Sequence, residues 1–240
     1  AAGALTIAIV TRPFTFEGKK RIANSVEGLN ALKEIVDSII VVSNDKLLIT
    51  GGNLPIAQAF SESDKVLAQS VKTVVDLILV PAVINLDFAD VRNTLLNSGI
   101  ALIGFGMGKG KNKAHDAAQT AINSPLLEAS LQGARKAIIA VTCGTNVSLF
   151  EAQETVNEIV ETSGSNLDVK FGVALNELLE DSIIVSVIAS DFEEQYDFTS
   201  THTSIIKPVT PESRTYHAED DEDDDSFLPN ILKELEAEEN

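Results

Sequence analysis

Asn85-Leu86-Asp87-Phe88-Ala89-Asp90-Val91-Arg92 is an acidic stretch at which the chain enters a helix shortly after a proline, Pro81. Asp87 and Asp90 are three residues apart, so on a helix both carboxylates share one face beside the N-terminal amides. One interpretation is a helix start, with Asn85 or Asp87 as the cap and Asp90 complementing the dipole. The other is a pair of carboxylates presented for chemistry. Spacing alone favours the helix start, because acidic residues are common there.

A long helix is predicted before this stretch, over residues 55–79. Pro55 suits a first turn and Pro81 ends the pattern. Apolar residues form one broad stripe along it: Ile56, Phe60, Val66, Leu67, Val71, Val74, Val75 and Ile78. About 25 residues at 1.5 Å each span roughly 37 Å, the width of a domain. The helix is therefore expected to separate two halves of the molecule.

The first half shows the pattern of a parallel sheet. A β-branched run at residues 5–10 predicts a strand buried on both faces. A helical pattern follows, with Ile22, Val26, Leu29, Leu32 and Ile35 on one face. Residues 38–42 predict the next strand, which ends in a turn at residues 43–45. Strand, helix and strand in this order form the unit of a parallel sheet.

The second half also alternates between strand and helix periods. Strands are predicted at residues 101–106, 136–143, 169–175 and 183–190, and helices at 113–122 and 149–162. The last two strands are joined by a short link, residues 176–182. The pattern predicts a small mixed sheet with helices on one face.

Charge is concentrated at the end of the chain. Residues 191–240 carry 16 of the 36 acidic side chains and only 3 of the 18 basic ones, so the first 190 residues are nearly balanced. This distribution argues against nucleic acid as a partner. Residues 191–225 are predicted to be disordered, because they bury too little apolar surface. Apolar positions return at Phe227, Leu228, Ile231, Leu232 and Leu235, which is typical of a helix that forms on a partner.

Bulk composition indicates an ordinary globular chain. The hydrophobic fraction is 44%, and no apolar run is long enough for a membrane span. Residues 1–10 lack the basic flank of a signal peptide. The single cysteine, Cys143, excludes an internal disulfide, fits a reducing cytoplasm and is expected to be a small buried residue.

The acidic stretch Asn85–Arg92, placed after a long helix and a proline, resembles the synergy loop of FtsZ, the bacterial tubulin-like cell-division GTPase. Further segments resemble the same family in order and spacing over residues 4–190: Leu5–Arg21, Ser43–Leu48, Gly104–Gly106, Asn123–Leu127 and Gly133–Arg135.

The resemblance implies an α/β fold in five parts. Residues 1–54 are a remnant of a parallel-sheet GTP-binding domain, and residues 55–97 are the central helix and synergy loop. Residues 98–190 are a tubulin-like C-terminal domain with a mixed sheet and helices. An acidic linker (191–225) and a partner-binding tail (226–240) follow.

The resemblance also implies an active site split between two subunits. One subunit binds GTP, and the next inserts its acidic loop against the γ-phosphate. By this analogy Asp87 and Asp90 orient or polarise the attacking water, with Asn85 helping to position it. Hydrolysis then accompanies self-association into filaments of the division ring in the cytoplasm. Adaptor proteins are expected to bind the tail, with no direct membrane insertion.

The nucleotide face is implied at a second group of residues. Glu17 and Arg21 match positions that contact ribose and phosphates, Asn44 matches a guanine contact, and Phe60 an aromatic residue beside the base. The plain alternatives are a solvated loop for Glu17 and Arg21, a turn residue for Asn44 and a core residue for Phe60. The family's guanine-binding aspartate is expected at position 65, where a lysine stands. Asp64, one place earlier, is turned by about 100° on a helix.

The family's phosphate-binding turns precede the strand at Leu5, and none has a match in this sequence. GTP or GDP, with its Mg²⁺, is therefore expected to be bound largely by a missing N-terminal half. The chain is therefore interpreted as a fragment, or as one that begins midway. The glycine-rich segment Gly104–Lys111 lacks the order of a P-loop and is predicted to be a flexible strand-to-helix loop.

Two other hypotheses remain. The chain can act as a non-enzymatic cap or adaptor that docks its acidic loop onto complete subunits and recruits partners through its tail. It can also be an unrelated small-molecule α/β domain, although the ordered run of motifs argues against this.

Overall fold

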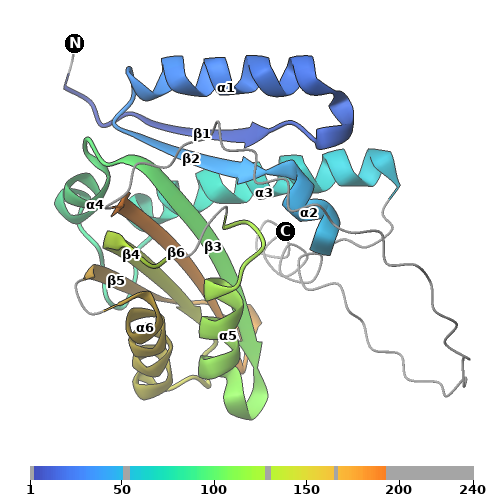
Figure 1. Ribbon diagram of the computed structural model, residues 1–240. Helices are drawn as coiled ribbons and strands as arrows, with labels where there is room; N and C mark the ends of the chain where they lie inside the picture. The colour runs from blue at the N-terminus through green and yellow to red at the C-terminus, as the bar shows by residue number, and fades with distance from the viewer. Residues whose placement is uncertain (1–2, 51–54, 128–130, 165–166, 193–240) are drawn as a thin grey trace, which may run out of the picture.

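The computed structural model describes residues 3–50, 55–127, 131–164 and 167–192, which form one six-stranded sheet with helices on both faces (Figure 1). The strands are β1 (Ile7–Arg12), β2 (Ser38–Ser43), β3 (Gly99–Lys109), β4 (Ala134–Cys143), β5 (Asp168–Leu175) and β6 (Ser182–Phe192). The α-helices are α1 (Lys19–Lys33), α2 (Asn44–Thr50), α3 (Ile56–Leu79), α4 (Phe88–Leu95), α5 (Lys113–Ile122) and α6 (Leu149–Ser163). Short 3₁₀ turns are η1 (Thr15–Glu17), η2 (Gly110–Asn112) and η3 (Glu177–Leu179).

Strand β3 joins the two predicted halves. The strand order is β1-β2-β3-β6-β4-β5. The first residues of β3 pair in parallel with β2, and residues from Leu102 onward pair antiparallel with β6. Strands β4 and β5 are parallel, so the second half is a mixed sheet, as predicted. Hydrophobic period identifies a strand but not its neighbours, which is why the continuity of the sheet was not predicted.

Alternate side chains of the sheet meet two helical layers. On one face α1 packs against Ile39, Val41 and Ile100, and α5 and α6 pack against the strands of the second half. On the other face the core includes Ile40 and Ile103 together with buried residues of α3 and α4. Helix α3 runs along this second face from the α2 side to the α4 side (Figure 1).

The structure confirms the α/β fold, and helices α3, α5 and α6 lie within a residue of their predicted bounds. The turn predicted at residues 43–45 is wrong, since α2 begins at Asn44. Asn and Asp favour helix starts as well as turns, so the sequence signal is shared. Ile35, predicted on the apolar face of the first helix, lies beyond the end of α1 and is exposed.

Strand β6 continues to Phe192, past the predicted boundary, because Phe192 pairs with Ala134 and Asp191 forms an ion pair with Lys136. The predicted linker and tail otherwise lie outside the described residues.

The prediction that the glycine-rich segment Gly104–Lys111 is a flexible loop is wrong, because most of it belongs to strand β3. Gly104, Gly106 and Gly108 lie in β3 and face α5. A Cβ added at Gly106 would lie 2.1 Å from the carbonyl oxygen of Ala117, and one at Gly108 would lie 1.9 Å from that of Lys113. The alternating glycines therefore let the α5 backbone lie directly on the strand.

Replacing Gly108 with alanine is expected to destabilise the fold. The new methyl group meets backbone atoms that cannot move aside cheaply, so a cost of about 3 kcal/mol and a fall in Tm of roughly 6–12 °C are expected. Gly28→Ala is the matched control: Gly28 lies in α1 with open space at its Cβ, and alanine there should be neutral or stabilising. Thermal unfolding of both variants tests this, and an unchanged Tm for Gly108→Ala would contradict the packing.

Lys113 is a nearly buried cation at the start of α5. Its Nζ lies 2.6 Å from Asp181 Oδ1 and 2.8 Å from Glu151 Oε1. Glu151 also completes a capping box with Ser148, the N-cap of α6. The hydrogen bond from Lys113 and those from Ser148 lower the pKa of Glu151 to about 2. This cluster ties α5, α6 and the start of β6 together.

Glu151→Gln is expected to lose a pH-dependent part of the stability. Because the folded pKa of Glu151 is lowered, the unfolded chain binds more protons between pH 4.5 and about 2. The contribution of Glu151 is therefore complete above about pH 4.5 and is lost as the pH falls toward 2. Thermal unfolding should show a deficit of Glu151→Gln at pH 7 that closes over this window. Glu154→Gln, an exposed change on the same helix, should show no such deficit.

Cys143 is buried at the end of β4, as predicted. Burial, with a smaller contribution from the charge of Glu151, raises the pKa of its thiol to about 11. The thiol is therefore a packing group and not a nucleophile.

Candidate functional site

The acidic loop forms the start of α4. Asp87 is the N-cap, and its Oδ1 accepts a hydrogen bond of 2.7 Å from the Asp90 amide. The helix-start interpretation of Asp87 is thus correct as a description of local structure. Among the described residues, neither Asp87 Oδ2 nor the carboxylate of Asp90 has a hydrogen-bond or ion-pair partner. The stretch therefore presents free carboxylate oxygens at a helix N-terminus.

The loop is held on both sides by the sheet. Ile84 forms an antiparallel bridge with Val173 of β5, with N···O distances of 3.1 and 3.0 Å. On the other side, Val91 and Leu95 of α4 are fully buried, and Ser190 of β6 donates to the Thr94 carbonyl. Side chains placed on such rigid elements keep their geometry without reorganisation.

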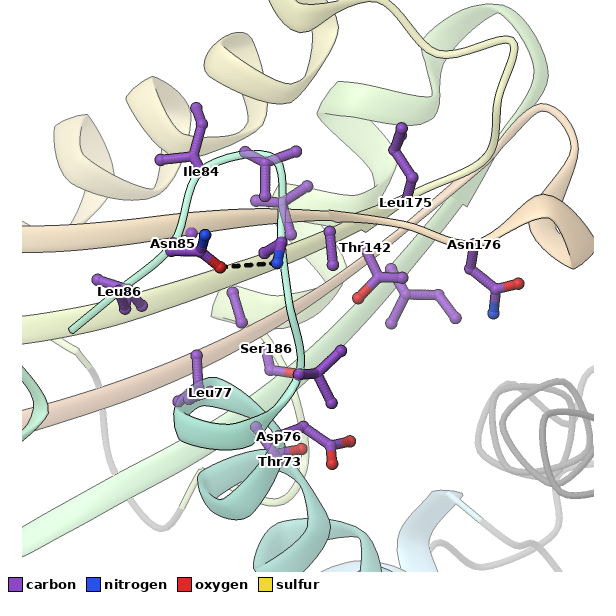
Figure 2. A pocket seen from close by; sticks show the side chains of 18 of the residues that line it. Thr73, Asp76, Leu77, Ile84, Asn85, Leu86, Thr142, Leu175, Asn176 and Ser186 are labelled. Carbon is purple, nitrogen blue, oxygen red and sulfur yellow. Dashed lines mark hydrogen bonds between the residues drawn. The ribbon is translucent and has the colours of Figure 1, made fainter. Parts of the chain in front are cut away.

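Asn85 shapes the loop from within. Its Oδ1 accepts a hydrogen bond of 2.7 Å from the Ala82 amide, and this bond closes the turn that follows Pro81 (dashed line in Figure 2). The side-chain nitrogen of Asn85 keeps its donor capacity.

The second group of predicted residues gathers around the beginning of α3. The ring of Phe60 meets Phe14 edge to face at a centroid distance of 5.1 Å, and Phe14 stacks on Phe16 at 4.9 Å. Phe60 is 41% exposed, whereas Phe14 is fully buried beneath it. Phe60 is therefore not simply a core residue, because part of its ring faces solvent on an aromatic platform.

Asn44 and Asp64 lie beside this platform. Asn44 is buried at the carboxyl end of β2, and its Oδ1 accepts from Ser63 Oγ at 2.6 Å. Asp64 follows Phe60 by four residues, so both lie on one face of α3. Lys65 is turned away and forms a salt bridge with Glu62. Asp64, not residue 65, thus places a carboxylate on the face of α3 that carries Phe60.

Glu17 and Arg21 form an ion pair at the entrance to α1. Glu17 Oε1 also accepts from the Phe14 amide at 2.9 Å, so its carboxylate closes the η1 turn. The Arg21 side chain is 70% exposed. The turn and the aromatic platform share Phe14, so Glu17 and Arg21 lie near Phe60 and near Asp64 on the same face of α3, while Asn44 is tied to that helix through Ser63.

The two groups lie at opposite ends of α3. Phe60 and Asp64 belong to its first half, and the acidic loop follows its last residue. Its 24 residues span about 36 Å. Figure 1 shows α2 near the start of α3 and α4 near its end. Within one chain the carboxylates of the loop cannot reach the aromatic platform.

A cavity of about 560 Å³ lies between the second half of α3, the acidic loop and strands β4, β5 and β6. Thr73, Asp76 and Leu77 line it from the helix, and Thr142, Ser186 and Leu175 from the sheet side (Figure 2). Asn85 also lines it, whereas none of the five predicted nucleotide residues does. The sequence contained no signal for this cavity, because it depends on how α3 sits over the sheet.

Sequence models and solved structures of known proteins match this chain. A sequence model described as "FtsZ family, C-terminal domain" matches residues 99–193, and one described as "Tubulin/FtsZ family, GTPase domain" matches residues 1–51. The empty FtsZ dimer of M. jannaschii is 38% identical, with a TM-score of 0.75 over 82% of this chain.

This chain belongs to the FtsZ family. A mutant FtsZ of M. jannaschii matches equally well, with 38% identity and a TM-score of 0.75 over 82% of this chain. The chain spans only 57% and 60% of the length of these two FtsZ chains. CetZ1 from Haloferax volcanii, solved as a GDP-bound monomer, shares the fold at 15% identity, with a TM-score of 0.63 over 80% of this chain and 57% of its own.

Within the FtsZ family match, Glu17, Arg21 and Asn44 lie in the segment matched as GTPase domain. Phe60, Asp64 and the acidic loop lie between the two matched segments.

The side chains present suit a purine nucleotide on one face. Phe60 has a partly exposed ring, Asn44 Nδ2 is a donor on a largely buried side chain, and Asp64 is an acceptor on the same helix face as Phe60. Arg21 offers an exposed guanidinium for phosphate oxygens. In the described part of the chain, no group of three acidic, His or Cys side chains is placed to hold a metal ion. No helix there is both long and apolar enough to cross a bilayer.

Proposed function

We propose that this chain is part of an FtsZ-type GTPase that polymerises head to tail, with the α4 loop of one subunit completing the nucleotide site of the next. The observation that carries the proposal is the separation of the two residue groups along α3. Groups separated in one chain by at least about 22 Å of helix, the length from Asp64 to Leu79, meet when identical subunits stack along the direction of that helix. A head-to-tail contact of this kind generates open filaments when the rotation between subunits does not close.

In this arrangement each group has a defined role. Asn44 and Asp64 bind the base edge, Phe60 packs against it, and Glu17 and Arg21 orient the ribose and phosphates. The bound nucleotide supplies the phosphoanhydride bond and carries Mg²⁺. From the neighbour, Asp87 and Asp90 accept hydrogen bonds from water and hold it for in-line attack, and Asn85 fixes the turn that presents them.

The structural relatives support this arrangement. One of the FtsZ structures is a dimer, and TubZ of Bacillus thuringiensis, 15% identical with a TM-score of 0.58, was solved as protofilaments in its GDP form. The wider role in the bacterial division ring, in the cytoplasm at the division site and with adaptors on residues 226–240, belongs to the same proposal.

The 240-residue chain alone is expected to bind GTP negligibly. In the proposed arrangement its described residues serve mainly the base and ribose, whereas the family's phosphate-cradling turns have no counterpart in this sequence. Titration calorimetry with GTP should therefore give no measurable heat of binding at micromolar concentrations. A micromolar Kd would show that the chain holds the phosphates by itself, and it would refute the expectation that other segments are needed to bind them.

The catalytic proposal is tested in an FtsZ-type subunit that contains these 240 residues together with phosphate-binding segments, called the complete subunit below. The non-enzymatic alternative predicts that Asp87 and Asp90 affect docking onto a filament but not turnover. Turnover and sedimentation of filaments, measured on the same variants, separate the two functions.

A further inference from the structure

The carboxylate of Asp45 binds Thr15 through both of its oxygens. Oδ1 accepts from the Thr15 amide at 2.8 Å, and Oδ2 accepts from the Thr15 hydroxyl at 2.5 Å. Thr15 is the first residue of η1, and Asp45 is the second residue of α2. The bonds therefore join the loop after β1 to the end of β2, across 30 residues of sequence.

This contact lies at the centre of the nucleotide face proposed above. Phe16 and Glu17, in the turn that Thr15 opens, supply the outer ring of the platform and the partner of Arg21. On the other side of the contact, Asn44 precedes Asp45 and is bound to Ser63 of α3. One carboxylate thus sets the distance between the ribose-side turn and the base-side residues.

We infer that Asp45 is a positioning residue for the nucleotide, which it does not touch itself. The inference rests on the proposed function, because it concerns the same face. The rings of Phe14 and Phe16 still pack against Phe60 when the two bonds are lost, but η1 is no longer tied to α2, so Glu17 and Arg21 are held less precisely relative to Asn44. Misplacement of binding groups by about 1 Å reduces binding or turnover by up to about 100-fold. Asp45 is remote from the acidic loop, so the loss falls on nucleotide binding.

The chain itself tests the geometry, without nucleotide. In Asp45→Ala the Thr15 amide loses its acceptor, so its hydrogen exchange should be at least about tenfold faster than in the unmodified chain. Asp37→Ala is a matched control, because Asp37 Oδ2 accepts from the Thr6 amide at 2.8 Å at the opposite end of β1. That change should accelerate exchange at Thr6 and leave Thr15 unchanged. Equal exchange at Thr15 in Asp45→Ala and the unmodified chain would overturn the inference.

The complete subunit tests the link to the nucleotide. Asp45→Ala should raise KM for GTP about tenfold, with kcat changed less than about twofold. Asp45→Asn should restore KM, because an amide can accept from the Thr15 amide and donate to its hydroxyl. Asp37→Ala should leave KM unchanged, which a general loss of stability would not.

The KM values of these variants distinguish a failure of the positioning role of Asp45 from a failure of the proposed nucleotide face. If Arg21→Ala raises KM and Asp45→Ala does not, the nucleotide face stands and the positioning role is wrong. If Arg21→Ala, Asn44→Ala and Asp45→Ala all leave KM unchanged, the proposed face itself is wrong. An equal rise of KM in Asp37→Ala and Asp45→Ala would also overturn the positioning role.

Discussion

Asp87→Asn/Asp90→Asn is expected to lower GTP turnover by the complete subunit about 10³-fold while GTP affinity stays within about twofold. Neither carboxylate contributes to the nucleotide face of its own subunit, because α3 separates them from it. Asparagine presents one carbonyl oxygen and an amide donor, so the negative charge that orients water is lost. The effect should therefore fall on kcat rather than on binding.

Asparagine also preserves the helix start, which makes this variant informative. Its side-chain oxygen caps a helix about as well as that of aspartate, so the side chain at position 87 still accepts the hydrogen bond from the amide of residue 90. Asp87→Ala removes the cap and costs about 1 kcal/mol in addition to its effect on turnover. Ser148→Ala removes the N-cap of α6 and is the matched control for loss of a cap elsewhere.

Turnover is measured by phosphate release, and affinity by titration with GTP under conditions without hydrolysis. We expect Asp87→Ala and Asp90→Ala each to block turnover with binding retained, and Ser148→Ala to retain turnover. Normal turnover by both aspartate variants would refute the assignment of the acidic loop.

Much of the fold was predictable because hydrophobic period reports burial directly. The helical period of residues 113–122 and 149–162 identified α5 and α6, and the apolar stripe from Ile56 to Ile78 identified α3. The hydrophobic period does not indicate which strands pair or which helix packs on which strand. The shared strand β3 and the close approach of α5 to Gly106 and Gly108 depend on which elements meet in space.

In the candidate site, too, local features were predictable from the sequence and long-range contacts were not. Asp87 was predictable as a helix cap, because an acid before a helical pattern satisfies free amides. The contacts of Asn44 with Ser63 and of Asp45 with Thr15 cross 19 and 30 residues of sequence and leave no local signal. The spacing of four residues puts Asp64 and Phe60 on one side of α3, but only the ring contact of Phe60 with Phe14 shows that this side faces the η1 turn.

The second large effect is expected when two inactive subunits are mixed. One variant, Asp87→Asn/Asp90→Asn, keeps its nucleotide face and lacks the acidic loop. The other, Arg21→Ala/Asn44→Ala, keeps the loop and is impaired in the nucleotide face. Because the two groups lie at opposite ends of α3, a junction in which the first variant supplies the nucleotide face and the second supplies the loop contains both intact groups, and the reverse junction contains neither.

The central claim is that the active site is assembled from two subunits, and this mixture tests it most directly. Each variant alone should be nearly inactive, and sedimentation should show that the mixture forms filaments. In an equimolar mixture with random assortment, about one quarter of the junctions join the two intact groups, so turnover should recover to about one quarter of the unmodified level. Turnover no greater than the average of the two separate variants, in filaments that contain both, would contradict the account.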